Sequence, residues 1–127
     1  MKYPYNRVYY PPIPELTIRI ISSESGLSTQ FMAAIVDTGA DATIVPIEYL
    51  HQIEASAEDD ARLRSPLGDF RVVKLYMVDI QIEDRTLFGI WVVGDETGDE
   101  VVLGRNVINR MRLLLDGLSL QSDVQYL

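Results

Sequence analysis

The sequence of 127 residues contains no cysteine, a single histidine and a single tryptophan. The lack of cysteine excludes disulfides, thiolate nucleophiles and cysteine metal ligands, and His51 alone cannot form a histidine-rich metal cluster. We therefore expect neither a metal nor another cofactor. No stretch approaches the roughly 18 to 20 apolar residues of a transmembrane helix, and the N-terminus has no apolar core typical of a signal peptide. These absences predict a cytoplasmic protein with no membrane partner.

Basic residues are scarce as well, because 11 Lys and Arg stand against 19 Asp and Glu, which gives a formal net charge of -8. An isoelectric point near 4.5 opposes the release of counterions that drives most binding to nucleic acid. We therefore expect no nucleic-acid partner. The content of 47% hydrophobic and 24% charged residues is typical of one compact globular domain.

Residues 1–14 differ in composition from the rest of the chain. They hold four tyrosines and four prolines, a mixture that favours extended backbone over helix. We expect an N-terminal arm over residues 1–14 and a single folded domain over residues 15–127. The favoured interpretation is an ordered tail whose rings pack on the surface of the domain, and the alternative is a dedicated motif for a partner.

Short apolar runs rich in β-branched residues follow the arm, and Gly, Asp and Ser turns separate them, which predicts an all-β fold. The expected strands are Glu15–Ile21, Gln30–Val36, Phe70–Ile82, Thr86–Val93, Val101–Leu103, Arg112–Leu115 and Leu118–Leu120. Two segments look helical. One is Pro46–Ile53, with proline at the expected first helical position, and the other is Arg105–Arg110.

The segment Ala33–Thr43 places Asp37 directly after an apolar strand and follows it with Thr38, Gly39 and small residues. Such a turn can hold the Asp37 carboxylate at the floor of a cleft. Gly39 lets the backbone approach a neighbouring chain or ligand closely, because it has no Cβ. The simpler interpretation is a turn that ends a strand, since Asp and Gly are residues that turns prefer.

This segment resembles the active-site turn of the retropepsin-like aspartic proteases, the family of retroviral proteases and their cellular relatives. A second match, Val101–Ile108, is similar to the apolar-apolar-Gly-Arg-Asn-apolar-apolar segment of that family, and Arg62–Val72 is similar in placement to its flap hairpin. The resemblance covers roughly residues 16–120. It implies a closed, retropepsin-like β-barrel with one or two short helices and a flap hairpin. The free-standing length and Met1 favour a cellular member.

The chemistry of this family requires two carboxylates that share a proton. The ionised carboxylate activates a water molecule, and the protonated one donates to the scissile carbonyl oxygen. Asp37 is the only aspartate of the sequence that is followed by Thr or Ser and then Gly. The resemblance therefore implies an aspartic endopeptidase that acts on extended polypeptide as a homodimer, with one Asp37 from each copy. The catalytic segment would be Asp37, Thr38 and Gly39.

The resemblance also implies structural roles around this turn. Thr38 would form a hydrogen bond across the dimer axis, and Arg105 would pair with Asp41 within one subunit. Asn106, in the segment that begins at Gly104, would hold the helix to the turn around Thr43. The alternative for Arg105 is an exposed charge at the start of a helix, which contributes little to stability.

Substrate would bind as an added β-strand between the active-site turn and the flap. The residues implied in binding are Ala40, Asp41, Ala42, Ile44 and Val102 in the body of the domain and Ser65, Pro66, Leu67 and Gly68 at the flap tip. Ile44 and Val102 would line apolar pockets.

Two departures from the family pattern affect these expectations. The flap tip has one glycine and a stiffening proline. Ala40 stands where pepsin-like relatives usually have serine, so no hydroxyl stabilises the ionised dyad, and we predict a milder pH optimum than that of secreted acid proteases. A pH profile that peaks below about pH 3 would contradict this prediction.

Three alternatives remain open from the sequence. The domain could be a catalytically silent retropepsin-like module that binds peptides or dimerises. The acidic stretch 95–100 could in principle bind a metal, but it lacks the ligand pattern of an EF-hand, so a solvated loop is favoured. The C-terminal leucines fit a dimer interface and a core equally well, namely Leu113, Leu114, Leu115, Leu118 and Leu120.

Overall fold

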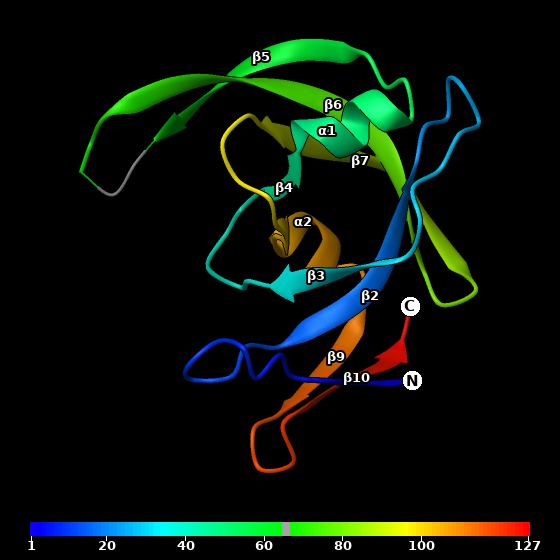
Figure 1. The fold of residues 1–127 in the computed structure, drawn as a ribbon, viewed down its shortest axis with the longest axis vertical. Coiled ribbons are helices and arrows are strands. Elements are labelled where there is room, and N and C mark those ends of the chain that lie inside the picture. The colour runs from blue at the N-terminus through cyan, green and yellow to red at the C-terminus, as the bar shows by residue number, and fades with distance from the viewer. Residues whose placement is uncertain (65–66) are drawn as a thin grey trace.

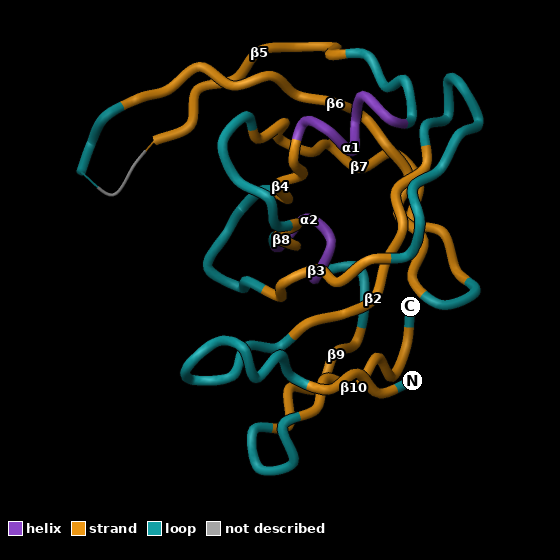
Figure 2. Tube along the Cα trace, viewed as in Figure 1, coloured by secondary structure: helices purple, strands orange, loops and turns teal. Residues whose placement is uncertain are grey.

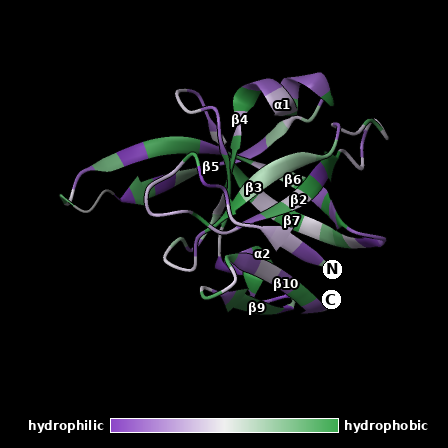
Figure 3. Ribbon diagram, turned by 60° about the horizontal axis from the view of Figure 1, so that its bottom comes forward, coloured by the Kyte–Doolittle hydropathy of each residue, from purple (hydrophilic) through white to green (hydrophobic). Residues whose placement is uncertain are grey.

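Alternating apolar side chains build the strands of the protein, whose computed structural model describes residues 1–64 and 67–127. In the strand Glu15–Ile21 (β2), Leu16, Ile18 and Ile20 are buried while Thr17 lies exposed between them. This period of two places one face of the strand in the core and the other toward solvent. The strands in the middle of the molecule accordingly carry much of the hydrophobic colour in Figure 3.

The remaining elements follow along the chain. The strands are β1 (Lys2–Pro4), β3 (Met32–Val36), β4 (Thr43–Pro46), β5 (Ala57–Arg64), β6 (Phe70–Ile82), β7 (Arg85–Asp95), β8 (Val101–Leu103), β9 (Arg112–Asp116) and β10 (Gln121–Tyr126). The helices are α1 (Ile47–Gln52) and α2 (Arg105–Ile108). None of the described helices is long and apolar enough to cross a membrane.

Six strands close into a barrel. Within the described residues the order is β2-β3-β8-β4-β7-β6, and β6 pairs back onto β2 to complete the circle. Figure 1 shows these strands wrapping around the centre of the molecule. The enclosed side chains include Ile18, Ile80, Val92 and Leu103, all fully buried. The sheet therefore has an apolar interior and no free edge around most of its circumference. An all-β barrel with two short helices agrees with the prediction from the sequence.

The strands β5 and β6 continue beyond the barrel as a long antiparallel hairpin. Their register runs from Ala57 opposite Tyr76 to Arg64 opposite Phe70. Figures 1 and 2 show this hairpin extending away from the body, on the same side as the loop between β3 and β4. It occupies the place expected for the flap.

Both chain ends belong to a separate small sheet of order β1-β10-β9. The Met1 ammonium donates to the Val124 carbonyl oxygen at 3.1 Å, and Tyr3 is buried beside it. The N-terminal arm is thus an ordered tail, although Tyr10 is exposed rather than packed on the surface.

Several strand boundaries predicted from the sequence are confirmed, among them those of β2, β6 and β8. The strand predicted at Leu118–Leu120 is wrong. The Asp116 carboxylate accepts hydrogen bonds from the backbone N–H groups of Leu118 and Ser119, which stabilises a turn, and β10 begins only at Gln121. The three leucines Leu113, Leu114 and Leu115 lie in β9 as predicted.

The predicted helices form in shorter versions. Pro46 precedes α1 instead of opening it, because it is still the last residue of β4 and pairs with Asp95. The second helix ends at Ile108, before the predicted end at Arg110. The strands β1, β4, β5 and β10 were not predicted. The β5 sequence, Ala57–Arg64, has four charged residues in its first six and lacks an apolar alternation.

Candidate active site

The strand β3 delivers Asp37 to the open end of the barrel. Val36, the last residue of β3, pairs with Leu103 of the parallel strand β8, and the Asp37 backbone N–H donates to the Leu103 carbonyl oxygen at 3.0 Å. Asp37 is exposed while Val36 beside it is buried. The chain therefore leaves the core at this residue and presents its carboxylate to solvent.

A tight turn fixes the Asp37 carboxylate. Its Oδ1 accepts a hydrogen bond from the Gly39 backbone N–H at 2.9 Å, and the Ala40 N–H donates to the Asp37 carbonyl oxygen at 3.2 Å. A Cβ on Gly39 would lie 3.2 Å from this same Oδ1. Glycine at position 39 therefore leaves the Asp37 carboxylate undisturbed. The close approach of a neighbouring chain or ligand at Gly39, expected from the sequence, stays a prediction.

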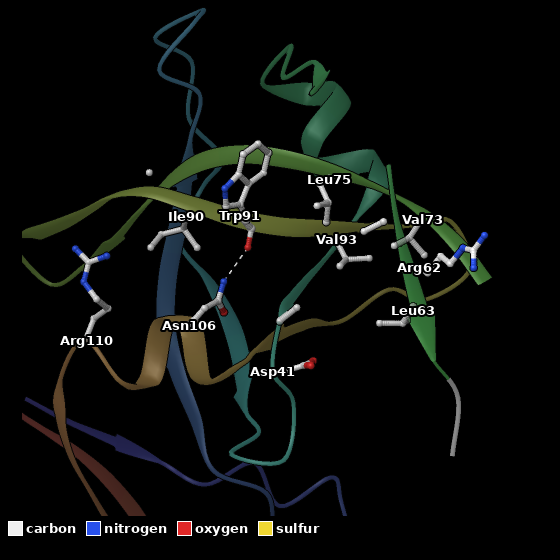
Figure 4. Close-up of a pocket in the computed structure, with 13 residues that line it drawn as sticks. Asp41, Arg62, Leu63, Val73, Leu75, Ile90, Trp91, Val93, Asn106 and Arg110 are labelled. Carbon is white, nitrogen blue, oxygen red and sulfur yellow. Dashed lines mark hydrogen bonds between the residues drawn. The ribbon is translucent and has the colours of Figure 1, made fainter. Parts of the chain in front are cut away.

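A chain of hydrogen bonds behind the turn joins α2 to β4 and β7. Thr43 Oγ1 accepts from the Gly104 N–H at 3.0 Å and donates to Asn106 Oδ1 at 2.8 Å. Asn106 Nδ2 then donates to the Trp91 carbonyl oxygen at 2.8 Å, as Figure 4 shows. The expected contact between Asn106 and Thr43 is present. Thr43 is fully buried, so each of these polar groups depends on its partner.

Gly104 permits a close approach of α2 to the turn. A Cβ at this position would lie 2.5 Å from the carbonyl carbon of Ala42 and 3.0 Å from its backbone nitrogen. Both are backbone atoms, which cannot move aside as a flexible side chain could. Only glycine fits this backbone packing.

The expected ion pair between Arg105 and Asp41 is wrong. Among the described residues Arg105 is exposed, and its Nη1 donates to the Thr38 carbonyl oxygen at 3.0 Å, while no ion pair with Asp41 forms. The Arg105 backbone N–H also donates to the Ala40 carbonyl oxygen at 2.8 Å. Arg105 therefore supports the turn by donating to two of the turn's backbone carbonyl oxygens, those of Thr38 and Ala40. The Asp41 carboxylate stays exposed to solvent.

A cavity of about 490 Å³ lies beside the turn, between the β5–β6 hairpin and β7. Asp41 and Ala42 line it at the turn, and Leu63 lines it from the hairpin. That Asp41 and Ala42 bind substrate stays a prediction. Figure 4 shows Arg62 and Arg110 at opposite ends of this cavity. Its walls are mostly apolar, so it suits an apolar side chain of a bound ligand. Ile44 and Val102 lie elsewhere, as half-buried cross-strand neighbours of β4 and β8.

The sequence matches no protein-family model and no curated protein. Solved structures do match. A retropepsin-like aspartic protease from Rickettsia conorii is 14% identical with a TM-score of 0.63, and the match covers 96% of this chain and 86% of that one. The chain has the retropepsin-like fold.

Two further structures share the retropepsin-like fold. EIAV protease in complex with an inhibitor is 15% identical with a TM-score of 0.54, and the match covers 77% of this chain and 86% of that one. The foamy viral protease-reverse transcriptase in complex with an RNA/DNA hybrid is 17% identical with a TM-score of 0.56. That match covers 78% of this chain and 12% of the viral chain, so this protein spans about an eighth of the viral chain's length.

The flap of this retropepsin-like fold has only part of its tip described. Ser65 and Pro66, expected to contact substrate, lie outside the described residues. Leu67 is exposed, and Gly68 has a φ of 90°, which favours glycine.

Several cavity residues were missed in the sequence. Val73, Leu75, Ile90 and Trp91 line the cavity from β6 and β7. The alternation of Val73 and Leu75 within a predicted strand was the available signal. It shows that the two side chains share one face of the strand, but it does not show that this face lines a cavity. Among the described residues there is no cluster of three or more His, Asp or Glu side chains arranged to hold a metal ion.

Proposed function

We propose that this protein is an aspartic endopeptidase that hydrolyses extended polypeptides with a dyad of two Asp37 carboxylates, one from each copy of a homodimer. The observation that carries the proposal is the exposed Asp37 carboxylate on a turn held by Leu103, Gly39 and α2, within a retropepsin-like fold. A rigid, solvent-facing carboxylate beside an apolar cavity suits hydrolytic chemistry more than it suits stability of the fold.

One copy provides only half of the catalytic groups. In the proposed mechanism, the ionised carboxylate takes a proton from a water molecule, whose oxygen bonds to the scissile carbonyl carbon. The protonated carboxylate donates its proton to the carbonyl oxygen. A hydroxyl of the resulting gem-diol intermediate returns its proton to the carboxylate that is now ionised, the C–N bond breaks, and the leaving nitrogen takes a proton from the other carboxyl group, so the dyad again holds one proton. Thr38 would stabilise the pairing of the two turns across the dimer axis.

Substrate would lie between the turn and the β5–β6 hairpin. Backbone groups of Gly39, Asp41 and Ala42 would pair with it as with an added strand, and the flap tip would cover it. An apolar side chain would occupy the cavity lined by Ala42, Leu63 and neighbouring residues.

The test is cleavage of a diverse peptide library by wild type and Asp37→Asn at about pH 4 to 8. We expect the wild-type rate to fall faster than linearly on dilution and Asp37→Asn to abolish cleavage. Because the mutation removes like-charge repulsion at the axis, the dimer should stay as stable or become more stable. Asp84→Asn, on the exposed β6–β7 turn, is the matched control and should retain activity.

The outcomes separate the proposal from the alternative. A folded wild-type dimer without cleavage would favour a silent module that binds peptides. A strictly monomeric wild type with full activity in sedimentation measurements would overturn the shared dyad.

A further inference from the structure

The N-terminal arm carries a loop, residues 7–12, that is fixed to the body of the protein. We call it the arm loop. Asn6 and Ile13 at its two ends form a β-bridge with hydrogen bonds of 2.8 and 3.1 Å. The Asn6 side chain accepts from the Val8 N–H at 2.9 Å and donates to Glu15 Oε2 at 3.0 Å. The arm loop is thus a defined projection.

This projection is connected directly to the strand that carries Asp37. The Pro14 carbonyl oxygen accepts from the Val36 N–H at 3.0 Å, one residue before Asp37. Tyr9 of the arm loop lines a hollow together with Ala33 and Ile35 of β3. In Figure 1 the arm loop, the turn after β3 and the β5–β6 hairpin all extend to the same side of the molecule. A copy that approaches the Asp37 turn from this side would therefore lie near the arm loop.

The exposed side chains of the arm loop have no partner within the described part of this copy. Val8 is 91% exposed and Tyr10 is 99% exposed, while Tyr9 between them is half-buried. Residues 1–14 contain Lys2 and Arg7 and no acidic residue, although the chain has a net charge of -8. Two such chains repel each other, so a basic, apolar projection beside the half-site lowers the repulsion where the two copies must meet.

The pairing of the terminal strands also bears on where a second copy can make contact. β10 has both of its edges paired within the chain, to β1 and to β9. A partner copy cannot insert a strand next to β10 without displacing one of these.

We infer that the arm loop is a contact surface for a second copy of this chain, with Val8 and Tyr10 as apolar contacts and Arg7 as the favourable charge. The inference rests on the proposed function, because the half-site at Asp37 defines where the second copy is needed. The connection from Pro14 to Val36 then links the dimer contact to the position of the catalytic turn.

Sedimentation over a concentration series tests the contact with the double variant Val8→Ser/Tyr10→Ser. Both side chains are exposed, so the fold should be unaffected, and we expect the dimer dissociation constant to rise at least about tenfold. The cleavage rate of the variant should fall at low concentration and recover at high concentration. Leu27→Ser is the matched control, because Leu27 is exposed on the β2–β3 connection, on the other side of the molecule in Figure 1.

A charge variant tests the electrostatic part separately. Arg7→Glu should weaken the dimer at low ionic strength, and its difference from wild type should shrink in about 0.5 M salt, where the Debye length is only a few ångströms. Arg85→Glu makes the same charge change at the exposed first residue of β7 and should have a smaller effect.

The failures of the two proposals are distinguishable. A wild-type dimer whose dissociation constant is unchanged in Val8→Ser/Tyr10→Ser would overturn the arm-loop contact and leave the shared dyad intact. A wild type that stays monomeric over the whole range would overturn both.

Discussion

The turn that carries Asp37 and the flap hairpin face the same cavity but are built in opposite ways. Behind the turn, Thr43 is 0% exposed, and hydrogen bonds join it to Gly104 and Asn106. On the outer part of the hairpin, Phe70 is 62% exposed and Val72 is 67% exposed, and the two strands pair mainly with each other. The turn therefore depends on the barrel for its position, whereas the outer hairpin does not.

The difference fits a division between fixed and movable parts. In the proposed dimer, the Asp37 carboxylate meets a second carboxylate and needs a position that is set to a fraction of an ångström. In the same proposal the hairpin covers the polypeptide and must open and close, and segments with few buried contacts open at low free-energy cost. The variants below test this comparison, from the largest expected effect to the smallest.

The largest effect is expected at Gly104. In Gly104→Ala the added Cβ would overlap with the Ala42 backbone, so the free energy of unfolding should fall by about 3 kcal/mol and cleavage should weaken as the turn moves. Urea unfolding measures this loss. The control is Gly117→Ala, whose added Cβ meets no atom within 4 Å. Equal stability of the two variants would show that the turn tolerates displacement, contrary to our comparison.

Thr43→Val keeps the shape of the side chain and removes its hydroxyl. The Gly104 N–H and Asn106 Oδ1 then lose a partner in a buried region, which should lower the free energy of unfolding by about 2 kcal/mol. Thr17→Val, on the exposed face of β2, is the control and should change stability by less than about 0.5 kcal/mol. A neutral Thr43→Val would mean that the hydrogen-bond chain does not stabilise the turn.

Tyr3 in the terminal sheet predicts that the free energy of unfolding depends on pH. Burial, together with the neighbouring Glu83 carboxylate, raises the pKa of the Tyr3 hydroxyl from 10.0 to about 12. Above pH 10 the unfolded chain loses this proton while the folded chain keeps it. The contribution of the protonated Tyr3 hydroxyl to the free energy of unfolding is therefore complete below pH 10, and it is lost as the pH rises from 10 through about 12.

Unfolding measured between about pH 9 and 11 in wild type and Tyr3→Phe tests this prediction. The variant should show a weaker decline of stability with pH, and Tyr126→Phe, at an exposed position, should behave like wild type. Parallel pH profiles for wild type and Tyr3→Phe would contradict the prediction.

The smallest effect on stability is expected in the flap. The Arg64 guanidinium lies 6.0 Å from the centre of the Phe70 ring, at the last described pair of the hairpin. Arg64→Ala should change the free energy of unfolding by less than about 0.5 kcal/mol, because both groups are exposed. Hydrogen exchange of the hairpin amides should nevertheless become faster than in the control Arg85→Ala. A loss of global stability comparable to that of Thr43→Val would remove the distinction between the two regions.

Local pattern was enough to predict much of the fold. The alternation in Glu15–Ile21 and the long β-branched run of Phe70–Ile82 gave strands with the bounds that the structure has. Strands whose sequence has no apolar alternation were missed. The strand β5 is mostly exposed and charged, and it forms because β6 offers its edge. Leu118–Leu120 had apolar residues, but the carboxylate of Asp116 stabilises a turn there.

For the candidate site, the sequence by itself determined which chemical groups are present: one Asp-Thr-Gly segment, a downstream Gly-Arg-Asn segment and no cysteine or histidine cluster. Residue types and their order carry this information, since a carboxylate, a hydroxyl and a missing Cβ have the same properties in any fold. Only the tertiary structure decided the partners. Arg105 contacts the Thr38 carbonyl instead of Asp41, and Pro14 contacts Val36 because β2 pairs with β3 in the register that places Glu15 opposite Ile35. Such contacts depend on distances of a few ångströms, which spacing along the chain does not fix.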